Sequence, residues 1–74
     1  MQENQLAVAF GSAVRRRRER LKISQDKFAD QIGMHRAYYS SIERGERNLT
    51  LRLIARVARG LNVRVSELMV DADL

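Results

Sequence analysis

The side chains with the clearest chemical meaning lie between residues 36 and 44. On a helix, their exposed face would show a guanidinium fork near the start, an aromatic hydroxyl and short polar groups. These residues are Arg36, Ala37, Tyr38, Ser40, Ser41 and Arg44. Short side chains let a helix lie deep in the major groove of DNA, and an arginine near its start can donate two hydrogen bonds to guanine. This surface is therefore typical of base recognition.

The remaining composition gives no support to an enzyme. The 74 residues include one histidine, no cysteine and no glycine-rich phosphate loop. The spacing of serine, histidine and aspartate residues does not support a catalytic triad. The 14 lysine and arginine residues exceed the 9 aspartate and glutamate residues, and the net charge of +5 is typical of a small domain that binds a polyanion. We therefore predict a binding protein with no catalytic site, no cofactor, no metal and no evident small-molecule ligand.

The sequence contains no apparent signal for export or for membrane insertion. No apolar run approaches the roughly 18 residues of a membrane span. The first five residues lack the basic and apolar regions of a signal peptide, and the absence of cysteine fits a reducing compartment. We expect a cytoplasmic protein that makes no membrane contact.

The spacing of apolar residues predicts an all-α chain. They recur at intervals of three and four, and nowhere alternate as in a strand. Helices are expected at about residues 6–22, 24–33, 35–44, 51–61 and 65–69, with Ser24 and Thr50 as N-caps and Gly33 and Asn62 as left-handed ends. The predicted core consists of Phe10, Val14, Leu21, Phe28, Ala29, Ile32, Tyr39, Ile42, Leu51, Ile54, Val57, Ala58, Leu61 and Leu68. The acidic tail, residues 71–74, is expected to fray.

Two of the expected helices form a helix-turn-helix. Residues 24–44 place two short helices on either side of Gly33, with apolar residues where the helices cross. Helices joined this tightly also occur in proteins that bind no nucleic acid. The basic charge and the surface of the second helix favour DNA.

Several residues of this segment resemble the phage-repressor-type (Xre) helix-turn-helix family. They are Ser24-Gln25, Phe28-Ala29, Ile32-Gly33 and Ile42-Glu43-Arg44-Gly45. Residues 36–51 are similar to the controller proteins of restriction–modification systems. The resemblance implies a compact five-helix, lambda-repressor-like domain over residues 1–74, acting as a transcriptional regulator that binds inverted-repeat operator DNA as a homodimer. The antitoxin of a toxin–antitoxin pair and a phage-type repressor remain alternatives.

The resemblance also implies roles for individual residues. Those expected at base edges are Arg36, Ala37, Ser40 and Ser41. Those expected at the DNA backbone are Gln25, Tyr38, Arg44, Arg47 and Asn48. Arg18 and Glu43 are expected to form a buried ion pair that ties the first helix to the end of the third. His35 departs from the family, which often has serine or aspartate as the N-cap at this position.

Four apolar residues are left over once the core is assigned, and they fall on or beside the last two expected helices. They are Leu49, Leu53, Val65 and Met69. Single exposed apolar residues are common on small proteins. A cluster of four favours a self-complementary patch, so we expect a twofold dimer formed by about residues 49–70. Three arginines, Arg52, Arg56 and Arg59, share one face of the helix expected at residues 51–61. We expect this face to be solvated.

Overall fold

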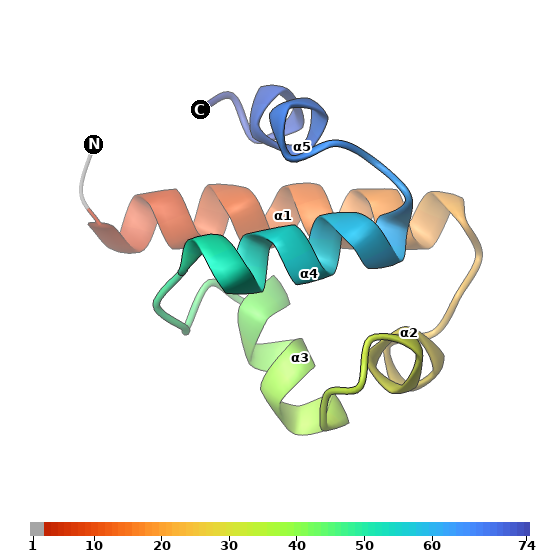
Figure 1. Ribbon diagram of the computed structural model, residues 1–74. Helices are drawn as coiled ribbons and strands as arrows, with labels where there is room; N and C mark the ends of the chain where they lie inside the picture. Colours follow the sequence, from red (N-terminus) through yellow and green to blue (C-terminus); the bar gives the residue numbers. More distant parts are fainter. Residues whose placement is uncertain (1–2) are drawn as a thin grey trace.

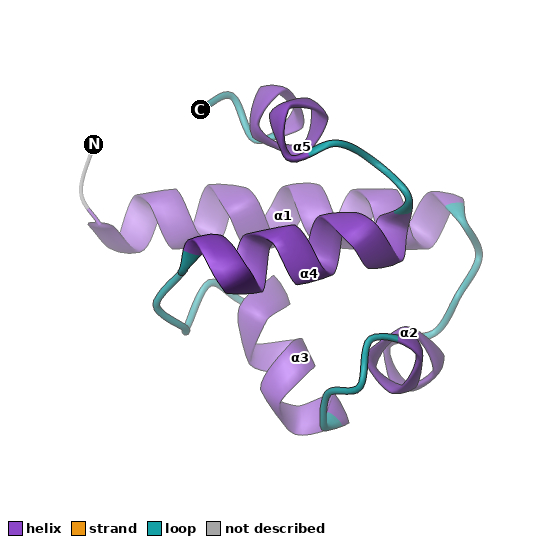
Figure 2. Cartoon of the chain, viewed as in Figure 1, coloured by secondary structure: helices purple, strands orange, loops and turns teal. Residues whose placement is uncertain are grey.

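The computed structural model describes residues 3–74, and these form five α-helices without a strand (Figures 1 and 2). The helices are α1 (Glu3–Arg20), α2 (Gln25–Gln31), α3 (Arg36–Glu43), α4 (Leu51–Leu61) and α5 (Val65–Asp71). The prediction of an all-α, five-helix chain is confirmed. Helix α1 begins and ends earlier than expected, and α5 continues past its expected end to residue 71. None of the described helices combines the length and the hydropathy that a bilayer span requires.

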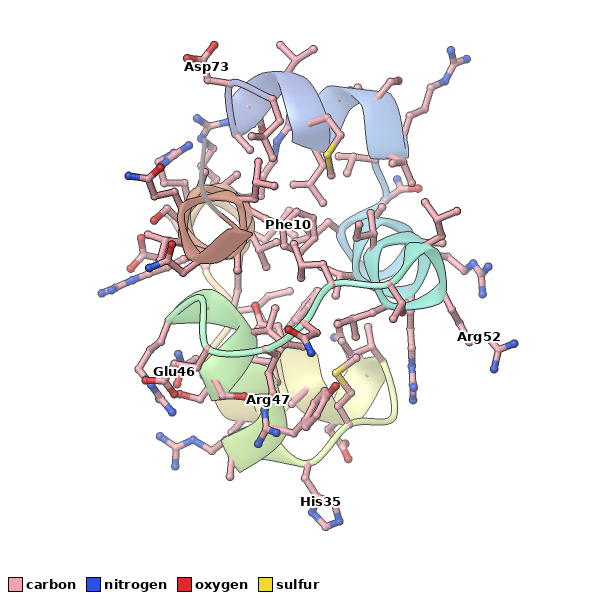
Figure 3. The ribbon with its side chains drawn as sticks, turned by 90° about the vertical axis from the view of Figure 1, so that its left-hand side faces the viewer. Phe10, His35, Glu46, Arg47, Arg52 and Asp73 are labelled. Atoms are coloured by element: carbon pink, nitrogen blue, oxygen red, sulfur yellow. The ribbon has the colours of Figure 1, made fainter. Side chains whose placement is uncertain are left out.

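The five helices are arranged in three levels. Helices α1 and α4 lie side by side in the middle of the molecule, α5 crosses on one side of them, and α2 and α3 lie on the other (Figure 1). The view turned by 90° shows the same order, with Phe10 in the centre between α1 and α4 (Figure 3). The helix-turn-helix and α5 therefore occupy opposite sides of the domain.

The core contains most of the residues that the apolar pattern predicts. Its largest fully buried side chains are Tyr39, Phe10, Phe28, Ile42, Leu68, Val14 and Val57. Two predicted core residues are wrong, because Leu21 is 49% and Leu51 is 83% exposed. Leu21 lies just beyond the end of α1, and Leu51 is the first residue of α4. Periodicity identifies the face of a helix but not whether a neighbour covers its terminal turn.

The predicted helix ends are largely correct. Ser24 Oγ accepts a hydrogen bond from the Lys27 amide, and Thr50 Oγ1 accepts one from the Leu53 amide, both at 3.1 Å. Residues 33 and 62 have φ angles of 70° and 59°, which confirms both left-handed ends. His35 is the N-cap of α3, and its side chain makes no capping hydrogen bond.

Two helical glycines mark close contacts between helices. A Cβ atom at Gly11 would lie 2.4 Å from the carbonyl oxygen of Ile42, so the absence of a side chain lets α1 touch the end of α3. A Cβ atom at Gly60 would lie 2.3 Å from Cγ2 of Ile32. Glycine inside a helix costs about 1 kcal/mol relative to alanine. At Gly60 that cost is explained by the approach of α4 to the end of α2.

The C-terminal tail does not fray as expected. Asp71 is still helical and forms an ion pair with Arg17, while Arg16 Nη2 donates a hydrogen bond to the Asp71 carbonyl at 2.9 Å. Ala72 is buried, and the Leu74 amide donates to the carbonyl of Met69 at 2.9 Å. The tail is ordered because arginines of α1, distant in sequence, hold the end of α5.

Candidate nucleic-acid interface

The first turn of α3 is the most accessible part of the helix-turn-helix. His35 projects from the end of the molecule away from α5 (Figure 3), and Arg36, Ala37 and Tyr38 are exposed beside it. Within residues 3–74, the guanidinium of Arg36 has no hydrogen-bond or ion-pair partner. A donor fork at this position is free to meet an acceptor outside the protein. Ser40, one turn later, is half-buried.

Ser41 is placed differently from the expectation that it faces base edges. Its residue surface is only 3% exposed. Its hydroxyl donates to the Tyr38 carbonyl at 2.5 Å and accepts a hydrogen bond from Arg47 Nε at 2.8 Å. Helical position alone put Ser41 near the outer face, but the loop that follows α3 folds back and covers it. Ser41 therefore positions Arg47 instead of presenting its own hydroxyl.

Arg47 and Tyr38 form a second exposed unit beside Arg36. The guanidinium carbon of Arg47 lies 4.7 Å from the centre of the Tyr38 ring, within the range of a cation–π contact. Because Ser41 holds Arg47 Nε, the arginine is fixed against α3 although it belongs to the following loop (Figure 3). Asn48, the next residue along that loop, is exposed. Together these residues extend the polar surface of α3 toward the loop.

Arg44 is engaged at the end of α3. Its Nη1 donates to Ser40 Oγ at 2.7 Å, and its Nη2 lies 3.0 Å from Glu46 Oε1. The hydrogen bond from Arg44 lowers the pKa of Glu46 below its usual value. Both side chains are more than half exposed, so solvent screens the pair and a competing anion could displace Glu46.

A buried polar cluster supports α3 from beneath. Arg18 Nε and Nη2 donate to the Glu43 carboxylate at 2.7 Å and 3.2 Å, and Arg18 Nη1 donates to the Ile23 carbonyl at 2.7 Å. The Tyr39 hydroxyl also donates to Glu43, and Gln25 Nε2 donates to its Oε1 at 2.8 Å. The side chains of Arg18 and Glu43 are 10% and 2% exposed. The cluster joins the end of α1, the start of α2 and the end of α3 through one carboxylate.

The charges of the cluster stabilise one another. Burial by itself would raise the pKa of Glu43, but the hydrogen bonds from Arg18, Tyr39 and Gln25 outweigh it and leave the pKa below its usual value. Burial, followed by the bond to Glu43, raises the pKa of Tyr39. Gln25 was expected at the DNA backbone. The family resemblance also implies that it braces the recognition helix, and its amide nitrogen does donate to Glu43, which ties α2 to α3.

The four leftover apolar residues differ in burial, and three of them lie beside two different hollows. Leu49, Leu53 and Met69 pack partly against the core, whereas Val65 is 37% exposed. Leu49 and Met69 line a common groove of about 580 Å³ between α1, the loop before α4 and the end of the chain. Val65 lines a separate hollow beside the end of α4. The sequence reasoning missed the exposed apolar Leu51, which it had assigned to the core.

Comparison with known proteins gives consistent matches. A helix-turn-helix family model matches residues 14–68. The control protein C.MunI of Mycoplasma sp is 39% identical over 71 residues, which cover 95% of this chain and 96% of that protein. The crystal structure of the restriction–modification controller protein C.AhdI from Aeromonas hydrophila superposes with a TM-score of 0.79 at 35% identity, covering 84% of this chain and 94% of C.AhdI. A chain from the structure of the controller protein C.Esp1396I tetramer in complex with its natural 35 base-pair operator matches with a TM-score of 0.79 at 25% identity. The match covers 93% of this chain and 96% of the C.Esp1396I chain.

Proposed function

This chain belongs to the helix-turn-helix family of transcriptional regulators, and from that premise we propose that it is a controller protein of a restriction–modification system. In this role it binds an inverted-repeat operator as a homodimer in the cytoplasm. The observation that carries the proposal is the first turn of α3, where an Arg36 fork without a partner among residues 3–74 stands on a helix braced from beneath by Glu43. The nearly full-length similarity to C.MunI supports the controller assignment.

The proposed mechanism is binding without catalysis. Helix α3 enters the major groove, with Arg36 donating to guanine and Ala37 and Ser40 close to the neighbouring bases. Contacts to phosphate set the register of the protein on the duplex and make its affinity depend on salt. The residues proposed for these contacts are Gln25, Tyr38, Arg44, Arg47 and Asn48. Gln25 contributes mainly by holding the start of α2.

The homodimer supplies the symmetry of the operator. A twofold axis presents two copies of α3 to half-sites of opposite orientation. We propose that the interface includes Leu53 and Met69, together with Leu49 and Val65 at its edges. The exposure of Leu51 at the start of α4 supports this location, because an apolar side chain gains stability when a partner covers it.

Binding by three arginine variants tests the proposal. The operator is first selected from a random DNA pool, and affinity for it and for a scrambled duplex is measured over a range of salt. Arg36→Ala should lose about 1–3 kcal/mol per half-site on the operator, with little change on the scrambled duplex. Arg47→Ala should weaken both duplexes and reduce the salt slope by about 1 per subunit. Arg52→Ala, on an exposed face of α4 (Figure 3), is the matched control.

The same measurements can contradict the proposal. A wild-type protein that selects no sequence from the pool would exclude operator recognition. If Arg36→Ala weakens both duplexes equally while Arg47→Ala removes the preference, the two roles are reversed. Neighbouring genes for a methyltransferase and an endonuclease distinguish the controller from a phage-type repressor.

A further inference from the structure

The turn of the helix-turn-helix leaves two carbonyl groups for another element to bind. Helix α2 ends in a Schellman motif, in which the Met34 amide donates to Ala29 at 2.8 Å and the Gly33 amide to Asp30 at 3.1 Å. These bonds use carbonyls inside the helix. The carbonyls of Ile32 and Gly33, in the turn itself, accept neither of these two bonds.

Arg56 of α4 binds both of these carbonyl groups. Its Nε donates to the Ile32 carbonyl at 2.7 Å, and its Nη2 donates to the Gly33 carbonyl at 2.8 Å. The planar guanidinium holds its donors in a fixed fork, which a lysine cannot reproduce. Its positive charge also lies at the C-terminal end of α2, where the helix dipole favours a cation. Arg56 is exposed, as expected of a solvated face, but its guanidinium is engaged by the end of α2.

Two glycines independently show that α4 and the turn are fitted to each other. A Cβ atom at Gly33 would lie 3.0 Å from Arg56 Nη2. One turn further along α4, a Cβ atom at Gly60 would lie 2.3 Å from Cγ2 of Ile32. The segment that joins α2 to α3 therefore contacts α4 at two positions, one helical turn apart. At Arg56 the contact is made by the guanidinium, and at Gly60 it is made by the helix backbone.

We propose that Arg56 is a positioning residue that transmits the geometry of the dimer to the recognition helix. This inference rests on the proposed binding of two half-sites by a homodimer. Arg56 lies three residues after Leu53, which we place at the interface, and it holds the turn from which α3 starts at Arg36. The fork therefore fixes where each α3 lies relative to the twofold axis.

The consequence is selectivity for the spacing of half-sites. Adding one base pair between half-sites moves one of them by about 3.4 Å along the duplex and about 35° around it. A rigid connection through Arg56 cannot follow that movement, so both helices fit only one spacing. A protein with a loosened turn should accept neighbouring spacings and hold the preferred one less tightly.

The test compares Arg56→Gln and Arg56→Lys with Arg52→Gln. Arg52 is exposed on the same helix and has no side-chain partner within residues 3–74, so it controls for loss of charge. Affinities are measured for a single half-site and for duplexes with the selected spacing and with one base pair more or fewer. Both Arg56 variants should bind the preferred duplex about tenfold more weakly than wild type, a loss of about 1.4 kcal/mol in binding free energy. Their half-site affinity should match that of the control, and their preference for one spacing should be lost.

Hydrogen exchange of the free protein gives a readout that is independent of DNA. The Met34 amide closes the Schellman motif, and its exchange should accelerate in both Arg56 variants but not in Arg52→Gln. Circular dichroism checks that each variant is folded, and Arg56→Lys preserves the charge if Arg56→Gln unfolds.

Each alternative result has a distinct meaning. If the Arg56 variants keep the spacing preference, the contact of Arg56 with the turn is only structural and the inference is overturned. If they weaken half-site and full operator equally, Arg56 is only a phosphate contact and the inference is likewise overturned. Unchanged exchange at Met34 overturns it as well. If wild-type protein shows no preference for duplexes with two half-sites, the proposed function itself fails, and the inference fails with it.

Discussion

Replacing Glu43 by alanine should remove much of the stability of this domain. The carboxylate accepts two hydrogen bonds from Arg18, one from Gln25 and one from Tyr39. In the variant, the guanidinium of Arg18 would keep its bond to Ile23, and the fully buried Tyr39 hydroxyl would lose its acceptor. The guanidinium charge of Arg18 would lose its counter-ion, and the Tyr39 hydroxyl would lose its acceptor, in a site that excludes most water.

The size of the effect follows from the burial of the pair. Removing one member of a buried ion pair costs about 3–5 kcal/mol. At about 0.05–0.15 kcal/mol per residue, a chain of this length has a total free energy of unfolding of roughly 4–11 kcal/mol. Glu43→Ala should therefore bring the domain close to unfolding. Arg18→Ala should have a similar effect. The loss of unfolding free energy in the double variant should be smaller than the sum of the two single losses by at least about 1 kcal/mol.

Urea unfolding followed by circular dichroism measures these changes. The exposed pair of Arg15 and Glu19, 3.3 Å apart and one turn apart on α1, provides the matched control. Glu19→Ala should change the free energy of unfolding by about 0.5 kcal/mol or less, because solvent screens that pair. If Glu43→Ala costs no more than Glu19→Ala, or if the two losses at Arg18 and Glu43 simply add, the cluster is solvated and the reasoning is refuted.

The pH dependence gives a second measurement of the same cluster. The folded-state pKa of Glu43 is lower than its usual value of about 4.3, so its contribution is fully present above that pH. The contribution is lost as pH falls through the folded-state pKa. Wild-type protein should therefore lose more stability on acidification over this range than Glu43→Gln, which has no carboxylate to protonate. Parallel stability curves for the two proteins would contradict the depressed pKa.

Three further predictions concern other parts of the fold. Leu53→Glu should convert the proposed dimer into a monomer in sedimentation, and should weaken binding to the full operator much more than to a half-site. Gly60→Ala should lower the free energy of unfolding by about 1 kcal/mol or more despite the helix preference of alanine, because the new methyl group would meet Ile32; a stabilised variant would contradict this packing. Asp71→Asn should lower the melting temperature at neutral pH. The hydrogen bond from Arg17 depresses the pKa of Asp71. The difference in melting temperature between Asp71→Asn and wild type should therefore shrink as pH falls below about 3.9.

Local features of the sequence were sufficient to predict the five helices and several of their ends, although not the bounds of α1 or the end of α5. Ser24 and Thr50 cap helices through their own hydroxyl groups, and residues 33 and 62 turn the chain through left-handed conformations. These properties depend on a few neighbouring residues, so they can be recognised without the fold. The apolar period likewise identified most of the core, because the buried face of a helix repeats every three or four residues.

The candidate site was predictable where it depended on one exposed turn of helix. The first turn of α3, with Arg36 and Tyr38, is accessible as expected from its place before the buried Tyr39. The resemblance to the Xre family identified the partners Arg18 and Glu43, and the structure adds Gln25 and Tyr39 to their cluster. Gln25 reaches Glu43 because α2 packs against α3, whereas Tyr39 lies one turn before Glu43 on α3, a spacing that the sequence contains.

Only the tertiary structure decided which polar groups face inward. Ser41 is buried because the loop after α3 folds back over it. Arg56 stays exposed, but its guanidinium binds two carbonyls at the end of α2 that lie within its reach. The acidic tail is ordered because Arg17 meets Asp71 from the other end of the chain. Leu51, the first residue of α4, is 83% exposed although it continues the apolar period of that helix. Each outcome depends on distances between segments far apart in sequence, which helical periodicity does not contain.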